Sequence, residues 1–134
     1  LKLEITESFA VDDADGTRGM LEELRRLGVR IYLDDFGTGY SSLGYLHRLP
    51  LDAIKIDRSF VMRMDDGPTH MQLVRTVREL ARNIGVAAVA EGVETEAQLT
   101  TLRALGCESA QGYLFSKPAP AHEIEQLLVR DPRW

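Results

Sequence analysis

Residues 73–91, LVRTVRELARNIGVAAVAE, contain one complete transition from helix to strand. The apolar residues of the first part recur with the period of a helix: Leu73, Val74, Val77, Leu80, Ala81 and Ile84. Gly85 then supplies a residue that adopts the left-handed conformation at little cost and closes the last helical turn. Residues 86–90 are a short apolar run typical of a buried strand, and Glu91 follows directly. The stretch predicts a helix, a tight turn and a strand that ends in a carboxylate.

The same unit recurs along the chain. Gly28 and Gly106 also follow amphipathic stretches, and Thr95 with Gln98 forms a capping box before the third helix. Further strands are expected within residues 1–6, 29–33, 53–57 and 109–115, and a final helix over 121–129. Strands that alternate with helices predict an α/β fold with parallel pairing.

Two architectures fit this order of elements: an open doubly wound sheet, or part of a (β/α)8 TIM-type barrel. The glycine fingerprint of dinucleotide-binding folds is absent, and residues 37–39 (GTG) are weak evidence for a phosphate loop. Five βα units also fall short of a whole barrel, which needs about 250 residues.

Composition excludes several classes of protein. The 134 residues carry a net charge of −5, which argues against binding to DNA or RNA polymers. No apolar run is long enough to span a membrane, and no signal peptide is visible. Cys107 is the only cysteine, so we expect no internal disulfide and a cytoplasmic protein. A strand at residue 1, without an initial Met, suggests a part of something longer.

Ionisable or amide residues stand at or near the end of every predicted strand. They are Glu4, Glu7, Asp34, Asp35, Lys55, Asp57, Glu91 and Gln111. In a βα barrel these ends converge on one mouth, where active sites form. Clustered carboxylates repel one another unless a divalent cation such as Mg2+ or Mn2+ relieves the repulsion. Such metals suit phosphodiester hydrolysis, with Lys55 as a fixed positive charge.

Asp34 and Asp35 pose a geometric question, because neighbouring residues of a strand point to opposite faces. Both can face one site only if the strand ends or bulges there. Asp35 is otherwise a cap or turn residue.

The motifs resemble those of EAL domains, the bacterial cyclic-di-GMP phosphodiesterases. The matching runs are residues 3–8 (LEITES), 34–43 (DDFGTGYSSL), 54–57 (IKID), 90–95 (AEGVET) and 111–113 (QGY). The resemblance covers essentially the whole chain, but only about the second half of the family's barrel. It implies the second part of a TIM-type barrel, with the Glu-Ala-Leu signature and a metal-binding Asn absent from residues 1–134.

The resemblance also implies roles for individual residues. The implied metal ligands are Glu4, Asp34 and Asp35, for two Mg2+ or Mn2+ ions per site. Lys55 and Glu91 would be catalytic. Lys55 would position the attacking water, and Glu91 would act as the general base. Glu7 would hold the loop of residues 36–42. The implied substrate-binding residues are Glu94, Gln111 and Tyr113.

The implied reaction is hydrolysis of cyclic di-GMP to linear pGpG in bacterial second-messenger signalling. The expected partners are a second copy of the chain, or sensory and GGDEF domains attached to the parent protein. The parent could reach a membrane through other domains, while this segment makes no membrane contact. Two alternatives remain: a degenerate receptor that binds cyclic di-GMP without cleaving it, and a scaffold. We expect the 134 residues alone to be inactive.

Overall fold

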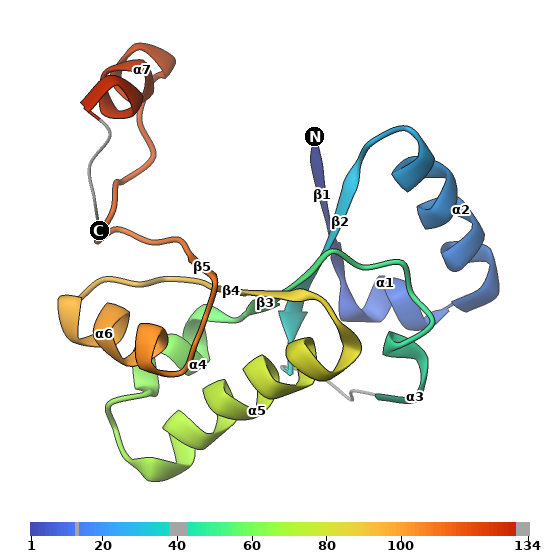
Figure 1. Cartoon of the computed structure of the whole chain (residues 1–134), viewed down its shortest axis with the longest axis horizontal. Coiled ribbons are helices and arrows are strands. Elements are labelled where there is room, and N and C mark those ends of the chain that lie inside the picture. The colour runs from blue at the N-terminus through green and yellow to red at the C-terminus, as the bar shows by residue number, and fades with distance from the viewer. Residues whose placement is uncertain (13, 38–42, 131–134) are drawn as a thin grey trace.

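The computed structural model describes residues 1–12, 14–37 and 43–130. It is an α/β structure with one five-stranded parallel sheet in the order β1-β2-β3-β4-β5 (Figure 1). The strands are β1 (Lys2–Thr6), β2 (Arg30–Phe36), β3 (Ala53–Ile56), β4 (Ala87–Ala90) and β5 (Ser109–Ala110). The helices are α1 (Glu7–Asp12), α2 (Ala14–Arg26), α3 (Leu43–Leu46), α4 (Arg58–Arg63), α5 (Pro68–Ile84), α6 (Glu96–Ala104) and α7 (Ala121–Arg130).

The strand order decides between the two predicted architectures. Each strand pairs with the next one in the chain, and the order never reverses. Right-handed crossovers between such strands place the helices on one face, so the sheet curls as in a barrel wall. A doubly wound sheet needs a reversal of strand order to carry helices on both faces. The fold is therefore a five-stranded part of a TIM-type barrel.

The hydrophobic core lies between the sheet and the helices. The strand register places one set of buried apolar side chains on the helix side of the sheet: Ile5, Leu33, Ile54, Ile56, Ala88 and Ala90. Helix α5 packs against β3 and β4 and contributes Val74, Val77 and Ala81 to this core. The apolar face predicted for residues 73–84 therefore packs against the central strands, except for Leu73, which is 42% exposed.

The predicted turns and caps are confirmed. Gly28, Gly85 and Gly106 have φ of 84°, 79° and 76°, the left-handed conformation expected after a helix. Thr95 and Gln98 form the predicted capping box at the start of α6. None of the described helices is both long enough and apolar enough to cross a membrane.

Two predictions about the outer strands are wrong in part. The last strand was expected over residues 109–115, but β5 ends at Ala110. Residues 112–116 turn instead, because the amides of Phe115 and Ser116 donate to the carbonyl of Gly112. In β1 only Ile5 is buried, although the apolar residues Leu1, Leu3 and Ile5 alternate with polar ones along residues 1–6. That strand has one described neighbour, β2, so less protein covers it.

Candidate functional site

The second face of the sheet carries the predicted polar residues. In the register, Glu4 lies beside Tyr32, and Tyr32 lies beside Ala53. Side chains two residues apart on a strand share a face. Asp34 and Lys55 lie two residues after Tyr32 and Ala53, and Glu91 lies two residues after Val89, the partner of Lys55, so all three share the face of Glu4. The face opposite the helices is thus the one that gathers charge.

Lys55 is the centre of this face. Its side chain is only 4% exposed, and its Nζ contacts a carboxylate from each of three other segments. The distances are 2.8 Å to Glu4 Oε2, 3.0 Å to Asp34 Oδ1 and 2.7 Å to Glu91 Oε1. Gln111 Nε2 donates to the same Glu91 oxygen at 2.7 Å. The structure therefore brings five of the predicted site residues into one hydrogen-bonded cluster.

The cluster changes the proton affinity of its members. Burial alone would lower the pKa of Lys55, but hydrogen bonds to Glu4, Glu91 and Asp34 outweigh it and raise that pKa above its ordinary value. Lys55 is therefore a permanent cation. Burial raises the pKa of Glu91, the ion pair with Lys55 opposes that rise, and the charges of Asp34 and Glu4 add to it. Glu91 thus binds a proton more readily than an exposed glutamate.

A bulge in β2 answers the question about Asp34 and Asp35. Leu33 pairs with Ile54 and Phe36 pairs with Ile56, so two residues of β2 lie opposite Lys55 alone. Asp35 adopts the left-handed backbone conformation, with φ of 54°. Its amide donates to Asp34 Oδ1 at 3.0 Å. The bulge therefore places both aspartates opposite Lys55, at the same level of the sheet.

Glu7 is buried at the start of α1, next to the end of β2. Its Oε2 accepts a hydrogen bond from the amide of Gly37 at 3.4 Å. Its Oε1 is buried without a hydrogen-bond partner among the described residues. The predicted loop of residues 36–42 lies outside the described residues from 38 onward. Glu7 thus contacts the backbone at Gly37, the last described residue before that gap.

Glu94 and Tyr113 lie beside the cluster. They line a cavity of about 380 Å3 together with Gln111, Arg58 and Lys117. Arg58 was not among the predicted site residues, yet its Nη2 contacts Glu94 Oε1 at 3.0 Å. The sequence did offer a signal for Arg58 as a site residue. It comes directly after β3 and Asp57, and ionisable residues follow the other strands too.

Metal-ligand chemistry is present only in part. Among the described residues, no group of three or more His, Cys, Asp or Glu side chains is arranged to hold a metal ion. The ammonium group of Lys55 stands between the carboxylates of Glu4, Asp34 and Glu91. Their oxygens are nevertheless hard donors, which suit Mg2+ or Mn2+ better than zinc.

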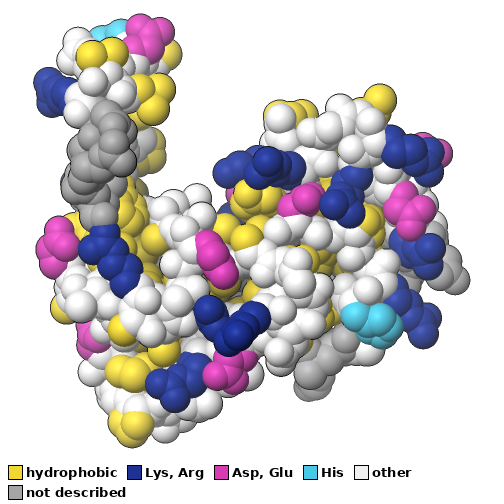
Figure 2. Space-filling model, in the orientation of Figure 1, with side chains coloured by type: hydrophobic (Ala, Val, Ile, Leu, Met, Phe, Trp, Pro, Cys, Tyr) yellow, Lys and Arg dark blue, Asp and Glu magenta, His cyan; other side chains and the backbone are white. Residues whose placement is uncertain are grey.

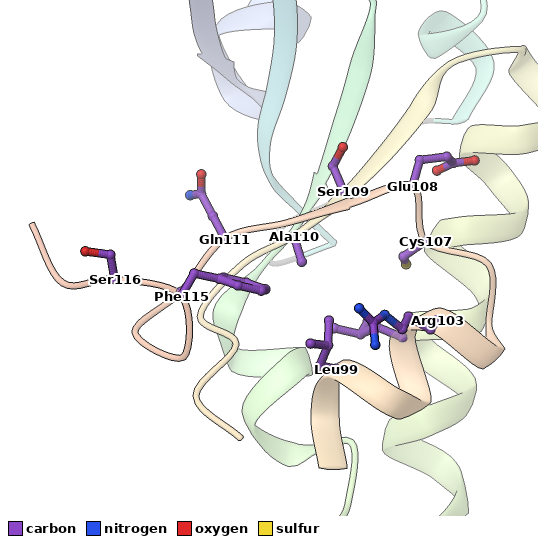
Figure 3. A pocket seen from close by; sticks show the side chains of 11 residues that line it. Leu99, Arg103, Cys107, Glu108, Ser109, Ala110, Gln111, Phe115 and Ser116 are labelled. Carbon is purple, nitrogen blue, oxygen red and sulfur yellow. The ribbon is translucent and has the colours of Figure 1, made fainter. Parts of the chain in front are cut away.

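A separate cavity of about 540 Å3 lies between α6 and β5. Figure 3 shows Leu99, Arg103, Cys107 and Phe115 around it. The only residue of the Lys55 cluster that lines it is Gln111. Its lining mixes apolar side chains with polar ones such as Arg103 and Glu108 and has no paired carboxylates, whereas the Lys55 cluster contains three carboxylates.

A sequence model described as the EAL domain matches residues 1–118. Among curated proteins, the chain is 49% identical over 128 residues to the cyclic di-GMP phosphodiesterase NbdA of Pseudomonas aeruginosa. That alignment covers 96% of this chain and 16% of the relative.

Solved structures give the same result. The PaMucR phosphodiesterase, in complex with c-di-GMP, shares 48% identity with a TM-score of 0.87, over 92% of this chain and 50% of that one. Klebsiella pneumoniae BlrP1, in a complex with manganese and cyclic di-GMP, shares 36% identity with a TM-score of 0.79, over 88% of this chain and 30% of that one. The chain thus spans half or less of these structures.

Proposed function

This chain belongs to the EAL domain family, and we propose that it supplies part of the active site that hydrolyses cyclic di-GMP to linear pGpG. The observation that carries this proposal is the buried Lys55, held by Glu4, Asp34 and Glu91 from three segments of the sheet. Buried charge is costly unless it is paired, so a purely structural barrel wall would not need it. The names of the relatives agree with this chemistry.

The proposed cofactor is a pair of Mg2+ or Mn2+ ions. The residues that would hold them are Glu4, Asp34 and Asp35, whose oxygens are of the kind these cations prefer. Ligands from outside residues 1–134 would complete the site, because the described residues contain no complete group. The manganese complex of BlrP1 supports a divalent cation. When bound, the metals would polarise the phosphoryl oxygens and make water a stronger nucleophile.

The chain's own residues then have definite tasks. Lys55 holds a positive charge near the reacting phosphate at any physiological pH, because its pKa is raised. Glu91 accepts a proton from the attacking water, which its own raised pKa favours. The water oxygen bonds to phosphorus, the P–O3′ bond breaks, and the leaving O3′ takes up a proton from solvent, which gives pGpG. Gln111 fixes the Glu91 carboxylate through its 2.7 Å hydrogen bond.

The cavity beside the cluster is the proposed place of the nucleotide. Glu94, Gln111 and Tyr113 line it, and Arg58 and Lys117 add positive charge. A cation near an aromatic ring suits an anionic ligand with flat bases. Glu7 would serve as the residue that keeps the end of β2 in place.

The activity belongs to the complete domain in this proposal. Half or less of each compared structure is covered, so the remaining strands and ligands would come from the rest of the barrel. The parent would act in the bacterial cytoplasm, as a dimer or under the control of attached sensory or GGDEF domains.

One observation favours a second candidate, a receptor that binds cyclic di-GMP without cleaving it. The Lys55 ammonium occupies the centre of the carboxylates, where a metal would compete with it. In a receptor this arrangement would persist, and the nucleotide would bind without hydrolysis.

Asp34→Asn tests the proposal in the complete domain. We expect it to abolish hydrolysis in saturating Mn2+, because an amide cannot supply the negative charge that holds the cation. The measurement is pGpG formation, with Asp65→Asn as an exposed control that should keep full activity. Activity of Asp34→Asn within about tenfold of wild type would remove it from the ligands. A wild-type domain that binds cyclic di-GMP but forms no pGpG would establish the receptor instead.

A further inference from the structure

The segment of residues 91–94, directly after β4, carries two of the proposed functional carboxylates. It is held by contacts on several sides. The Gln98 side chain accepts a hydrogen bond from the amide of Glu94 at 2.8 Å. The amide of Val93 donates to the carbonyl of Gln111 at 3.1 Å. These bonds fix the backbone of the segment but leave the Glu94 carboxylate to be oriented by something else.

Arg58, the first residue of α4, makes two separate contacts with this segment. Its Nη2 contacts Glu94 Oε1 at 3.0 Å. Its aliphatic stem covers Gly92, where an added Cβ would stand 2.3 Å from Arg58 Cγ. Gly92 also has φ of 68°, so both the space and the backbone conformation require glycine there. One arginine from another βα unit therefore touches the backbone and the carboxylate of the same short segment.

We infer that Arg58 is a positioning residue that orients Glu94 toward the cyclic dinucleotide, an inference that rests on the proposed function. With one oxygen held by the guanidinium, the second oxygen has a defined direction in which it can accept N–H donors of a base. The two side chains are 54% and 39% exposed, so the pair contributes little to stability. The pair instead sets the direction of the Glu94 carboxylate at the edge of the cavity. Gln111 lines the same cavity and donates a hydrogen bond to Glu91.

The first experiment substitutes Arg58 in the complete domain. Arg58→Gln removes the charge but keeps the stem over Gly92, so the segment should keep its place. We expect KM for cyclic di-GMP to rise about tenfold while kcat stays within about threefold, because ground-state and transition-state binding fall together. Arg58→Lys keeps the charge and should recover part of the loss. Arg25→Gln is the matched control, since Arg25 pairs with Asp52 before β3, and should leave both constants unchanged.

A double-mutant cycle separates positioning from direct contact. If Arg58 acts through Glu94, then Arg58→Gln should add nothing to the KM of Glu94→Gln. Additive effects would show that Arg58 contacts the substrate itself and would overturn the inference. An unchanged KM in Arg58→Gln would overturn it as well.

Calorimetric titration with cyclic di-GMP in Ca2+ measures binding without relying on hydrolysis. It therefore tests the role of Arg58 separately from the proposed hydrolase activity. A wild type that binds the dinucleotide in Ca2+ but forms no pGpG in Mn2+ refutes the hydrolase, while the Kd of Arg58→Gln in Ca2+ still tests the role of Arg58. We expect that Kd to rise about tenfold in parallel with KM. An equal Kd in wild type and variant would refute the role of Arg58 alone. A wild type without binding or cleavage would refute both.

Discussion

At the scale of single residues, Lys55 and two glycines illustrate how close contacts shape the site. The Lys55 side chain is 4% exposed and has three carboxylates within 3.0 Å, so its burial is offset by pairing. Gly92 lies within the segment of residues 91–94, and Gly112 packs against the backbone of that segment. An added Cβ at Gly112 would stand 2.1 Å from the carbonyl oxygen of Val93. Backbone, unlike a flexible side chain, cannot move away without displacing Glu91 and Glu94.

Gly112→Ala should therefore lower both the stability and the activity of the complete domain. The expected loss is about 1–3 kcal/mol of unfolding free energy, the usual cost of inserting a methyl group into a packed region. The measurement is urea unfolding together with pGpG formation. Gly19→Ala in α2 is the control, because nothing lies within 4 Å of the added Cβ. Alanine there should raise the stability by up to about 1 kcal/mol, and the reverse order of the two variants would contradict the packing argument.

Cys107 provides a prediction about pH. Burial raises the pKa of its thiol to about 11, Glu108 adds to the rise and Arg78 opposes it. The charged thiolate is the disfavoured form, so the thiol stays protonated at pH 8 and reacts slowly. We expect the rate of iodoacetamide modification to rise about tenfold per pH unit from 8 to 10 and to level off above about 11. Mass spectrometry measures it, and the urea-unfolded chain is the control. A rate that levels off near pH 9 in the folded protein would contradict the prediction.

At the scale of elements, the two ends of the strands are used differently. The carboxyl ends gather Asp34 and Glu91 around Lys55. At the amino ends, the carboxylates immediately before β3 and β5 bond to backbone instead. Asp52 accepts from the amide of Ile31 at 2.8 Å, and Glu108 accepts from the amide of Ala88 at 3.1 Å. Each therefore ties its own strand to the preceding one in the sheet. In barrels of this type the amino ends serve stability and the carboxyl ends serve chemistry.

Asp52→Ala should accordingly destabilise the complete domain while sparing its chemistry. Loss of a charged acceptor that serves a partly buried amide costs about 1–3 kcal/mol. We expect kcat and KM at 25 °C to stay within about twofold of wild type, because the Lys55 cluster lies at the other end of the strands. Thermal unfolding and pGpG formation measure the two effects. Glu22→Ala, which removes an exposed pair with Arg18, should change neither. A fall in kcat with unchanged stability would place Asp52 in the catalytic machinery instead.

At the scale of the whole molecule, both sides of the described sheet are open. Strands β1 and β5 are the outermost strands, and each pairs on one side only. Leu1 is 93% exposed beside β1. Helix α7 stands apart from the other helices (Figure 1), has no buried residue, and presents hydrophobic side chains on its surface (Figure 2). Its Leu128 and Val129 are 72% and 86% exposed. Open strand edges and uncovered apolar surface favour association.

We therefore predict that these 134 residues alone do not hydrolyse cyclic di-GMP. They should self-associate, or bind the other half of the domain when it is supplied as a separate chain. Light scattering gives the mass in solution, and pGpG formation is measured with and without the added half. An equal amount of bovine serum albumin in place of that half is the control. A stable monomer that hydrolyses cyclic di-GMP unaided would contradict both the openness of the barrel and the proposed ligand set.

The sequence alone determined the features that depend on neighbours along the chain. The helical period of residues 73–84, the left-handed glycines and the capping box at Thr95 are local, so their spacing predicts them. The charge at each strand end was visible as well, and parallel strands bring such ends together. The two-residue period of a strand also showed that Asp34 and Asp35 can face one site only if the strand ends or bulges there, and the structure has the bulge.

Only the tertiary structure decided what depends on residues far apart in the chain. The strand order selected the barrel, because two architectures share one order of elements. After β5 ends at Ala110, the chain turns and Gly112 packs against Val93, a residue of another βα unit, which no local pattern encodes. The pairing of Arg58 with Glu94 joins residues 36 positions apart. Such contacts form only when separate βα units meet at the mouth of the barrel. Which residues pair there depends on how the units pack and on where their charges lie.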